Sequence, residues 1–344
     1  MDHAFSICAS FCDVEERVKY EQAIPGTQKF EEVVVSDIVR DKDMKVSRIC
    51  FTHGLVRVNM LYLGTILKTS PDVNVIWNAT RHTRSAHNIR HLRMTPQHVP
   101  CVKTLRNLQS LYIDNPINPS LEYTFQLQNC HQLEKLTIVN CTPPSEYAIA
   151  QLENLRKLTI VSYDLDGDAI SKYKLEDLQL VEELTLSGFY RVVDLEPLRR
   201  LNTIVKLELY GLQCVDNIRA LKQLTNLKTL VMYHFNSLES IDSLGNLKNL
   251  ENLSLNYLRD VDDFSSLGNL VNMKILNLES CGISKLEPLR YMKKLTSLKI
   301  YKCNNITSVK PLKDLKGLQK LYLLRNHKII DLDKLSKHVE INII

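Results

Sequence analysis

The residues best suited to metal binding are three cysteines and a histidine near the N-terminus. Cys8 and Cys12 are separated by three residues, and Cys50 and His53 by two. Thiolates and imidazoles are the usual ligands of structural zinc sites. However, none of the nine cysteines forms a C-x-x-C pair, so we favour buried thiols that pack as small apolar groups. We therefore expect no metal and no other cofactor.

Motifs of the common enzyme classes are absent from the sequence. It contains no phosphate-binding G-x-x-x-x-G-K-[ST], no nucleophile elbow G-x-S-x-G and no zinc-protease H-E-x-x-H. Only 10 glycines occur among 344 residues, which is few for an enzyme built on glycine-rich loops. The chain is therefore predicted not to be an enzyme.

Composition narrows the class of protein further. The 44% of hydrophobic residues suffices for folding, but no run approaches the roughly 18 apolar residues of a membrane span. The apolar patch from Ala4 to Cys12 has no basic stretch before it and acidic residues directly after it, so no signal peptide is expected. An odd number of scattered cysteines fits free thiols in a reducing compartment. We expect a cytoplasmic or nuclear protein without membrane association.

The net charge of the whole chain is only +5, but residues 73–113 form a basic tract. No Asp or Glu occurs there, whereas the cationic or titratable residues are Arg81, His82, Arg84, His87, Arg90, His91, Arg93, His98, Lys103 and Arg106. Such a tract could meet RNA phosphates or an acidic protein. Only Trp77 and Tyr112 could stack on bases, so a solvated surface is the preferred interpretation.

An internal repeat extends from about residue 86 to the end of the sequence and must position any functional side chain. Its pattern is L-x-x-L-x-x-L-x-L, in which the third apolar residue marks each turn. Spacings run from 19 to 26 residues, most often 23. The twelve markers are Leu92, Leu111, Leu136, Leu158, Leu184, Leu207, Leu230, Leu253, Leu276, Leu298, Leu321 and Ile341. Weaker candidates lie upstream at Ile49-x-Phe51 and Val73-x-Val75.

The apolar residues after each strand also recur. Val192, Leu195 and Leu198 follow the marker Leu184, and several other turns repeat this rhythm. Spacing by three suits a short 3-10 or helical segment. Proline stands where such a segment would begin at Pro197, Pro288 and Pro311. One turn buries too few side chains to offset its own backbone entropy, so the turns must stack on one another.

These residues resemble the leucine-rich repeat family. The turns of 22 or 23 residues that contain L-E-P-L or V-K-P-L are similar to the repeats of internalins and of the regulatory repeat subunit of protein phosphatase one. They also look like leucine-rich repeat proteins of trypanosomatid parasites. The resemblance implies an α/β solenoid, in which a curved parallel β-ribbon lines the concave face and short helical or 3-10 segments form the convex side.

One position departs from the family pattern, which places Asn or Cys five residues after the marker. Several turns keep that residue type, at Cys141, Cys281, Cys303 and Asn326, but others hold Tyr163, Phe189, Leu212, Phe235 and Leu258. An apolar side chain cannot satisfy the polar groups of the bend. The middle turns are therefore predicted to bond their bends through backbone or water.

The outward positions of each strand are candidate binding positions. They lie one residue before the marker, one after it and three after it, and five of the 14 tyrosines fall on these positions. Tyrosine combines a large apolar body with a polar tip and is enriched at interface hot spots, although it is also a good strand former. The candidate partner-binding residues are Arg93, Tyr112, Tyr210, Tyr233, Tyr301 and Tyr322.

We predict a leucine-rich repeat solenoid at residues 86–344 and an irregular N-terminal cap with degenerate repeats at residues 1–85. The expected function is that of a non-catalytic scaffold or regulatory subunit, which binds a partner protein on the concave face. Two alternatives remain open. One is a substrate receptor of a ubiquitin ligase that uses residues 1–85 to bind the adaptor. The other is a ribonucleoprotein component that uses the basic tract.

Overall fold

The computed structural model describes the strands at 32–36, 50–52, 55–58 and 74–78, followed by residues 88–94, 105–114, 127, 129–141, 149–162, 170–326 and 328–343. The chain divides into two compact units, Met1–Leu155 and Arg156–Ile344. The predicted boundary at residue 85 lies outside the described residues.

The N-terminal unit is a β-sheet whose strands follow the order β7-β6-β5-β4-β1-β3-β2. These strands are β1 (Glu32–Ser36), β2 (Cys50–Thr52), β3 (Leu55–Val58), β4 (Asn74–Asn78), β5 (His91–Met94), β6 (Ser110–Asp114) and β7 (Lys135–Val139). From β4 to β7 the pairing is parallel. Leu92 pairs with Leu111 and Leu111 with Leu136, which confirms the predicted phase of these turns. The residue opposite Leu92 on β4 is Val75. The candidate Val73-x-Val75 therefore does mark a repeat strand, but Val75 occupies the marker position that the pattern gave to Val73.

The first three strands do not continue the repeat in sequence order. Strand β1 is inserted between β4 and β3, and it runs parallel to both. Strand β2, which contains Phe51, pairs with β3 in the antiparallel direction. Only two residues separate β2 from β3, a connection that permits a hairpin but no parallel crossover. The prediction of a repeat strand at Phe51 is therefore wrong.

The C-terminal unit is a stack of parallel strands, each hydrogen-bonded to the next in sequence order. Its strands are β8 (Lys157–Val161), β9 (Glu183–Ser187), β10 (Lys206–Tyr210), β11 (Thr229–Tyr233), β12 (Asn252–Asn256), β13 (Ile275–Glu279), β14 (Ser297–Tyr301), β15 (Lys320–Leu324) and β16 (Glu340–Ile343). In every pair the markers face each other, as Leu207 and Leu230 do. The predicted phase is thus confirmed throughout this unit.

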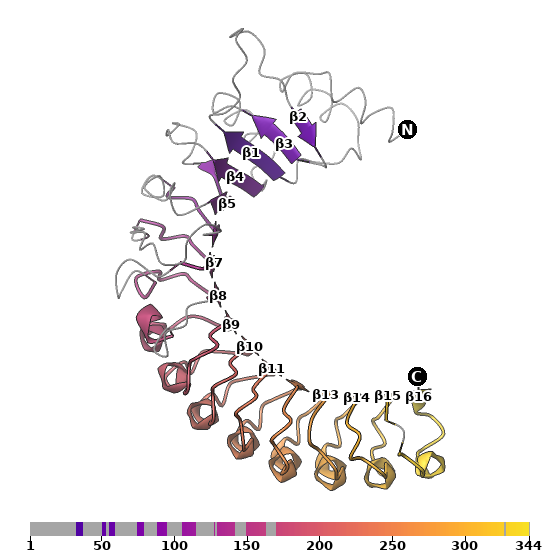
Figure 1. The fold of residues 1–344 in the computed structure, drawn as a ribbon. Helices are drawn as coiled ribbons and strands as arrows, with labels where there is room; N and C mark the ends of the chain where they lie inside the picture. The colour runs from indigo at the N-terminus through magenta and orange to yellow at the C-terminus, as the bar shows by residue number, and fades with distance from the viewer. Residues whose placement is uncertain are drawn as a thin grey trace, which may run out of the picture. The chain divides into compact units, whose positions relative to one another are not determined.

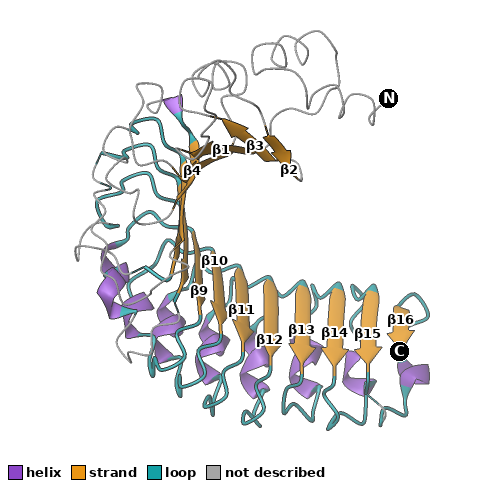
Figure 2. Cartoon of the chain, turned by 45° about the horizontal axis from the view of Figure 1, so that its top comes forward, coloured by secondary structure: helices purple, strands orange, loops and turns teal. Residues whose placement is uncertain are grey.

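Short 3-10 helices form the opposite side of the C-terminal unit. They are η3 (Ser171–Tyr173), η4 (Leu175–Asp177), η5 (Glu196–Leu198), η6 (Arg219–Gln223), η7 (Asp242–Asn246), η8 (Ser265–Asn269), η9 (Glu287–Tyr291), η10 (Lys310–Leu312) and η11 (Leu332–Lys334). Pro197, Pro288 and Pro311 stand in the first turn of η5, η9 and η10, as predicted. Within this unit, Figure 1 shows the strands along the concave side and the helices along the convex side, and Figure 2 separates the two by colour.

The core of each turn lies between the strand and its 3-10 helix. Burial alternates along the strands: Leu207 and Leu209 are buried, whereas Lys206, Glu208 and Tyr210 remain partly exposed. The apolar residues of the helical side, such as Leu221, close the same core. The period of two on the strand and of three on the helix therefore points the repeated leucines of the pattern inward.

A residue with positive φ ends most strands of the repeat, four positions after the marker. Two of these residues are glycines, Gly188 and Gly211. The others are Asn140, His234, Tyr257, Ser280, Lys302 and Arg325. Their φ angles range from 51° (Ser280) to 81° (Gly188). In this conformation the backbone N–H turns toward the next strand and donates to its last carbonyl. Thus the N–H of Gly211 bonds Tyr233 O at 2.8 Å, and that of His234 bonds Asn256 O at 3.1 Å.

These backbone bonds explain how the middle turns manage without Asn at the following position. Phe189, Leu212, Phe235 and Leu258 are all fully buried there, so they extend the core by one more apolar side chain per turn. The polar groups of the bend are bonded by the backbone, as predicted from the sequence. Each turn gains burial in place of a side-chain hydrogen bond.

Turns that keep Asn or Cys at this position use it to bond the backbone. Asn326 Nδ2 donates to Ile300 O at 2.8 Å and to Leu324 O at 2.9 Å, and its Oδ1 accepts from the Cys303 N–H at 2.9 Å. The Cys281 thiol donates to Leu255 O at 3.2 Å in the same geometry. Asn326 thus joins its turn to the preceding one through two hydrogen bonds and makes a third within its own turn.

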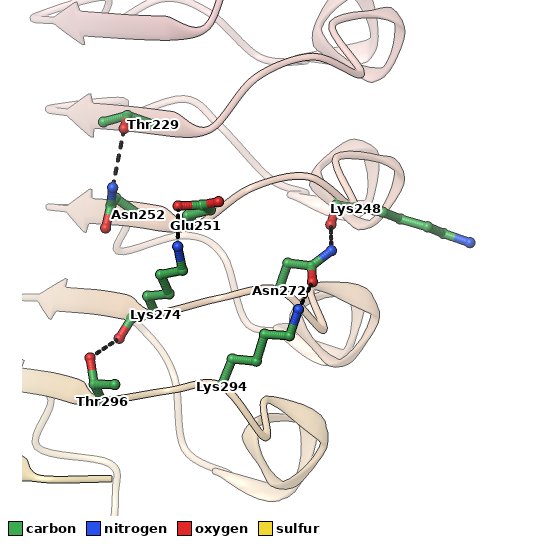
Figure 3. A network of polar contacts seen from close by, with 8 residues as sticks. All are labelled: Thr229, Lys248, Glu251, Asn252, Asn272, Lys274, Lys294 and Thr296. Atoms are coloured by element: carbon green, nitrogen blue, oxygen red, sulfur yellow. Dashed lines mark hydrogen bonds and ion pairs between the residues drawn. The ribbon is translucent and has the colours of Figure 1, made fainter. Parts of the chain in front are cut away.

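A second set of asparagines joins the turns at the opposite edge, where the strands begin. They lie four residues before the marker, and each donates to a backbone carbonyl of the preceding turn, as Asn249 does to Thr225 O at 2.9 Å. Figure 3 shows this edge around Asn272, which donates to Lys248 O at 2.9 Å and accepts from Lys294 Nζ at 2.7 Å. In the same network Lys274 Nζ bonds Glu251 Oε2 at 2.7 Å. The repeat therefore has polar links along both edges of its sheet.

Candidate functional site

Four aromatic side chains meet where strands β10, β11 and β12 end, and we name them the aromatic cluster: Tyr210, Tyr233, His234 and Tyr257. The ring centroids of Tyr210 and Tyr233 are 6.3 Å apart, and the His234 ring stacks on Tyr233 at 4.4 Å. Tyr257 meets Tyr233 edge-on at 5.2 Å and His234 at 4.5 Å. All four remain partly exposed. The cluster is therefore a continuous, accessible aromatic surface spanning three turns.

The fold places these rings together through two features of the repeat. In-register pairing sets Tyr210 directly opposite Tyr233 on the outward side of the sheet. The positive φ of His234 and Tyr257, 60° in both residues, goes with their own side chains lying on the same face as Tyr233, which both rings contact. An extended residue at either position would instead place its side chain on the other face of the pleat.

Burial and neighbouring side chains raise the pKa of two of the tyrosines, Tyr210 and Tyr257. Partial burial, together with the Glu208 carboxylate, raises the pKa of Tyr210. The pKa of Tyr257 is raised by the adjacent Tyr233, and partial burial and Glu279 act in the same direction. Both phenols therefore stay neutral and can donate hydrogen bonds at physiological pH. Glu208 itself pairs with Lys206 at 2.9 Å.

Tyr301 and Tyr322 lie farther along the same unit, in a basic environment. Lys302 Nζ is 4.9 Å from the centroid of the Tyr301 ring, and Lys299 Nζ and Arg325 Cζ are within 6.0 Å of it. Tyr322 is the register partner of Lys299 on the neighbouring strand. These two predicted residues therefore belong to a mixed aromatic and cationic surface, distinct from the aromatic cluster.

Arg93 and Tyr112 lie in the N-terminal unit, where they are register partners on β5 and β6. The Arg93 guanidinium stacks 4.7 Å from the centroid of the Tyr112 ring, and its Nη2 lies 3.5 Å from Asp114 Oδ2. Arg93 is therefore already engaged with two neighbours. The six predicted residues thus lie in pairs on neighbouring strands, of which Arg93 with Tyr112 and Tyr210 with Tyr233 are in side-chain contact.

Reasoning from the sequence missed His234, Tyr257, Lys302 and Arg325. It considered the outward positions of the strand and stopped three residues after the marker, whereas these residues stand at the fourth. The available signal was the mixed composition of the fourth position after the marker, which is glycine in some turns and a large polar or aromatic residue in others. Glycine at Gly188 and Gly211 indicated a left-handed bend, and the same bend had to recur in every turn.

The metal and basic-tract hypotheses fall mostly on residues that the structure does not describe. Cys8, Cys12 and His53 are outside the described ranges, and so is much of residues 73–113. In the part of the chain with described side chains, no group of three or more His, Cys, Asp or Glu residues could hold a metal ion. Within the same part, no helix has the length and apolar character needed to cross a membrane.

Comparisons with known proteins identify the fold. No family model matches the sequence, and no curated protein matches it. Among solved structures, the internalin inlF of Listeria monocytogenes is similar at 19% identity over 84% of this chain and 78% of its own, with a TM-score of 0.50. TLR13, solved in complex with ssRNA13, is similar at 19% identity over 78% of this chain and 42% of its own, with a TM-score of 0.59. A leucine-rich repeat protein of Leptospira interrogans is similar at 17% identity, over 80% of this chain and 85% of its own, with a TM-score of 0.40.

Proposed function

Because the chain is a leucine-rich repeat protein, we propose that it is a non-catalytic scaffold or regulatory subunit that binds a partner protein on the concave strand face of its C-terminal unit. The single observation that carries the proposal is the aromatic cluster. Its four rings contact one another on three neighbouring turns while remaining accessible.

The physical case for a protein partner rests on how these rings are held. Tyrosine offers a large contact area with few rotatable bonds, and rings that already pack against one another lose little further freedom on binding. Neutral phenols at Tyr210 and Tyr257 can also donate hydrogen bonds across an interface. A preformed patch of this composition is typical of the centre of a protein interface.

The other candidate residues extend this proposed surface. Tyr301 and Tyr322 lie on the same strand face and add aromatic and cationic contacts on later turns. Arg93 and Tyr112 provide an equivalent pair on the strands of the N-terminal unit. We therefore propose a partner that contacts the strand face and not the 3-10 side.

The described residues favour neither alternative function. Residues 1–85, proposed to bind a ligase adaptor, contribute only backbone strands to the described part of the chain. Within the described part of the basic tract, Arg93 pairs with Asp114. TLR13 was solved with single-stranded RNA, but its likeness to this chain is one of fold. A protein partner is therefore the function we propose.

Affinity purification with a matched pair of variants tests the proposal. The full chain serves as bait in native extract, with bound proteins quantified by mass spectrometry. Tyr210→Ala combined with Tyr233→Ala should reduce capture of the specific partner at least about tenfold, because hot-spot tyrosines contribute roughly 2 kcal/mol or more each. The control is Tyr291→Ala, which removes an exposed tyrosine from the 3-10 side in η9.

The control variant should capture the partner as the wild type does, and thermal melting should show that all variants remain folded. Equal capture by the wild type and the Tyr210/Tyr233 double variant would contradict the proposed binding surface. Turnover of a small molecule by the purified chain would contradict a non-catalytic role.

A further inference from the structure

The C-terminal turns are far more basic than the turns that carry the aromatic cluster. Residues 229–287 contain four Lys and Arg but eight Asp and Glu, whereas residues 288–330 contain eleven Lys and Arg and a single acid, Asp314. Both segments lie within the C-terminal unit. The charge along this unit therefore changes sign close to strand β14.

A shallow hollow lies on the basic side of this change, at the edge where the strands end. It has a volume of about 550 Å³ and is open to solvent. Arg259, Lys302 and Arg325 supply cations to its lining, and Asn304 and Asn305 supply side-chain amides. Every one of these groups can donate hydrogen bonds, which is the chemistry that recognises an anion.

Among the described residues, the three cations of the hollow have no carboxylate partner. In the described part of the chain, no carboxylate forms an ion pair with Arg259, Lys302 or Arg325, whereas other lysines of the unit do form such pairs. Lys274, for example, bonds Glu251 at 2.7 Å. Positive charge at the hollow is therefore available to a ligand.

The cations are also held in place before any ligand arrives. The backbone of Lys302 and Arg325 is fixed by the left-handed bend, with φ of 53° and 55°, and the N–H of Lys302 bonds Leu324 O at 3.0 Å. Both side chains lie within 6.0 Å of the Tyr301 ring, which attracts cations through its π-face. Ordering these groups around an anion therefore costs little additional entropy.

We propose that this hollow binds a short acidic segment of the partner protein, with Asp or Glu carboxylates seated between Arg259, Lys302 and Arg325. This inference rests on the proposed function and adds the charge of the ligand. The hollow spans only a few turns, and Asp260 and Glu279 are the sequence neighbours of its lining residues Arg259 and Ser280. A long phosphate backbone needs a continuous cationic track with open stacking platforms, whereas Tyr301 is flanked here by three cations.

A direct binding measurement tests the proposal with the full chain. The probe is a fluorescein-labelled peptide that alternates Glu and Ser, and the control probe replaces each Glu with Gln. Fluorescence anisotropy at low salt should show binding of the Glu peptide alone, weakening as salt is raised. Absence of binding at low salt, or equal binding of the Gln peptide, would overturn the inference.

Paired charge reversals separate the hollow from net charge. Lys302→Glu with Arg325→Glu should weaken binding of the Glu peptide on the order of tenfold or more. Lys313→Glu with Lys316→Glu changes the net charge equally at exposed positions outside the hollow, and should change affinity less than about threefold. Equal weakening by both pairs would contradict a specific site. If a single-stranded oligonucleotide binds more tightly than the Glu peptide, and the Lys302/Arg325 variant loses this binding too, the ligand of the hollow is nucleic acid and the proposal of an acidic peptide is wrong.

The outcome remains separable from that of the proposed function. The aromatic cluster does not line the hollow, so Tyr210→Ala with Tyr233→Ala should leave affinity for the Glu peptide unchanged. Failure of the peptide to bind would therefore contradict the acidic ligand, while unchanged partner capture by the tyrosine variant would contradict the aromatic surface.

Discussion

Replacing Asn326 with alanine tests whether side-chain hydrogen bonds hold successive turns together. The wild-type amide makes three hydrogen bonds, all between 2.8 and 2.9 Å: two join the preceding turn, at Cys303 N and Ile300 O, and one joins Leu324 O in its own turn. Each contributes a net of about 0.5–1.5 kcal/mol. Asn326→Ala should therefore lower the free energy of unfolding by about 1.5–4.5 kcal/mol. The upper part of this range applies if the Cys303 N–H finds no replacement partner.

The damage should be local, because each turn of a solenoid contacts mainly its neighbours. Hydrogen exchange followed by mass spectrometry should show faster exchange in strands β14 and β15 than in the wild type, with β9 and β10 unaffected. Asn236→Ala is the matched control, since Asn236 is exposed and a surface substitution changes stability by only about 0.5 kcal/mol.

Urea unfolding of the same two variants gives the magnitude. A loss below about 0.5 kcal/mol for Asn326→Ala, or a loss equal to that of Asn236→Ala, would refute the reasoning. It would show that the backbone bonds of the bend suffice in this turn, as they do in the turns that bury phenylalanine or leucine at the same position.

Two further predictions concern titratable groups. Burial alone would raise the pKa of the Asp331 carboxyl, but hydrogen bonds from the Ser308 hydroxyl and two backbone N–H groups outweigh burial and hold the pKa below its usual value of 3.8. The ionised form therefore stabilises the fold above about pH 4, and this contribution disappears as pH falls through the lowered pKa. The urea midpoint of Asp331→Asn should be lower than that of the wild type at neutral pH and should change less as the pH is lowered. Identical pH profiles of the two proteins would contradict this. Burial raises the pKa of the Cys130 and Cys141 thiols to about 12, whereas Cys214 is exposed. Iodoacetamide at pH 8 should therefore alkylate Cys214 at least about a hundredfold faster, and peptide mapping that finds similar rates would contradict the burial.

The repeat itself could be predicted because its signal is local and recurs. Leucines at fixed spacing all face the core when alternate residues of the strand point inward and every third residue of the helical side does the same. All twelve markers, from Leu92 to Ile341, lie in strands, and adjacent markers pair within each unit. The order of β1, β2 and β3 could not be predicted in this way, because short irregular strands carry no periodic signal that specifies their neighbours.

The candidate site was only partly predictable for a related reason. Tyr210 and Tyr233 occupy outward strand positions, so the pattern identified them. His234, Tyr257, Lys302 and Arg325 stand in the bend, where composition alone does not tell which way a side chain points. Their backbone conformation follows from hydrogen bonds to the next turn, which exist only once the turns have stacked.

The sequence by itself therefore determined the repeat, its phase and the inward direction of its leucines, since each of these depends on residues within one turn. Tertiary structure alone decided which outward residues meet. The contacts among Tyr233, His234 and Tyr257, and the hollow between Arg259 and Arg325, join residues of different turns. The physical reason is that the register between turns sets residues of different turns side by side. The left-handed bend that this register stabilises brings the residues of the bend onto the same surface.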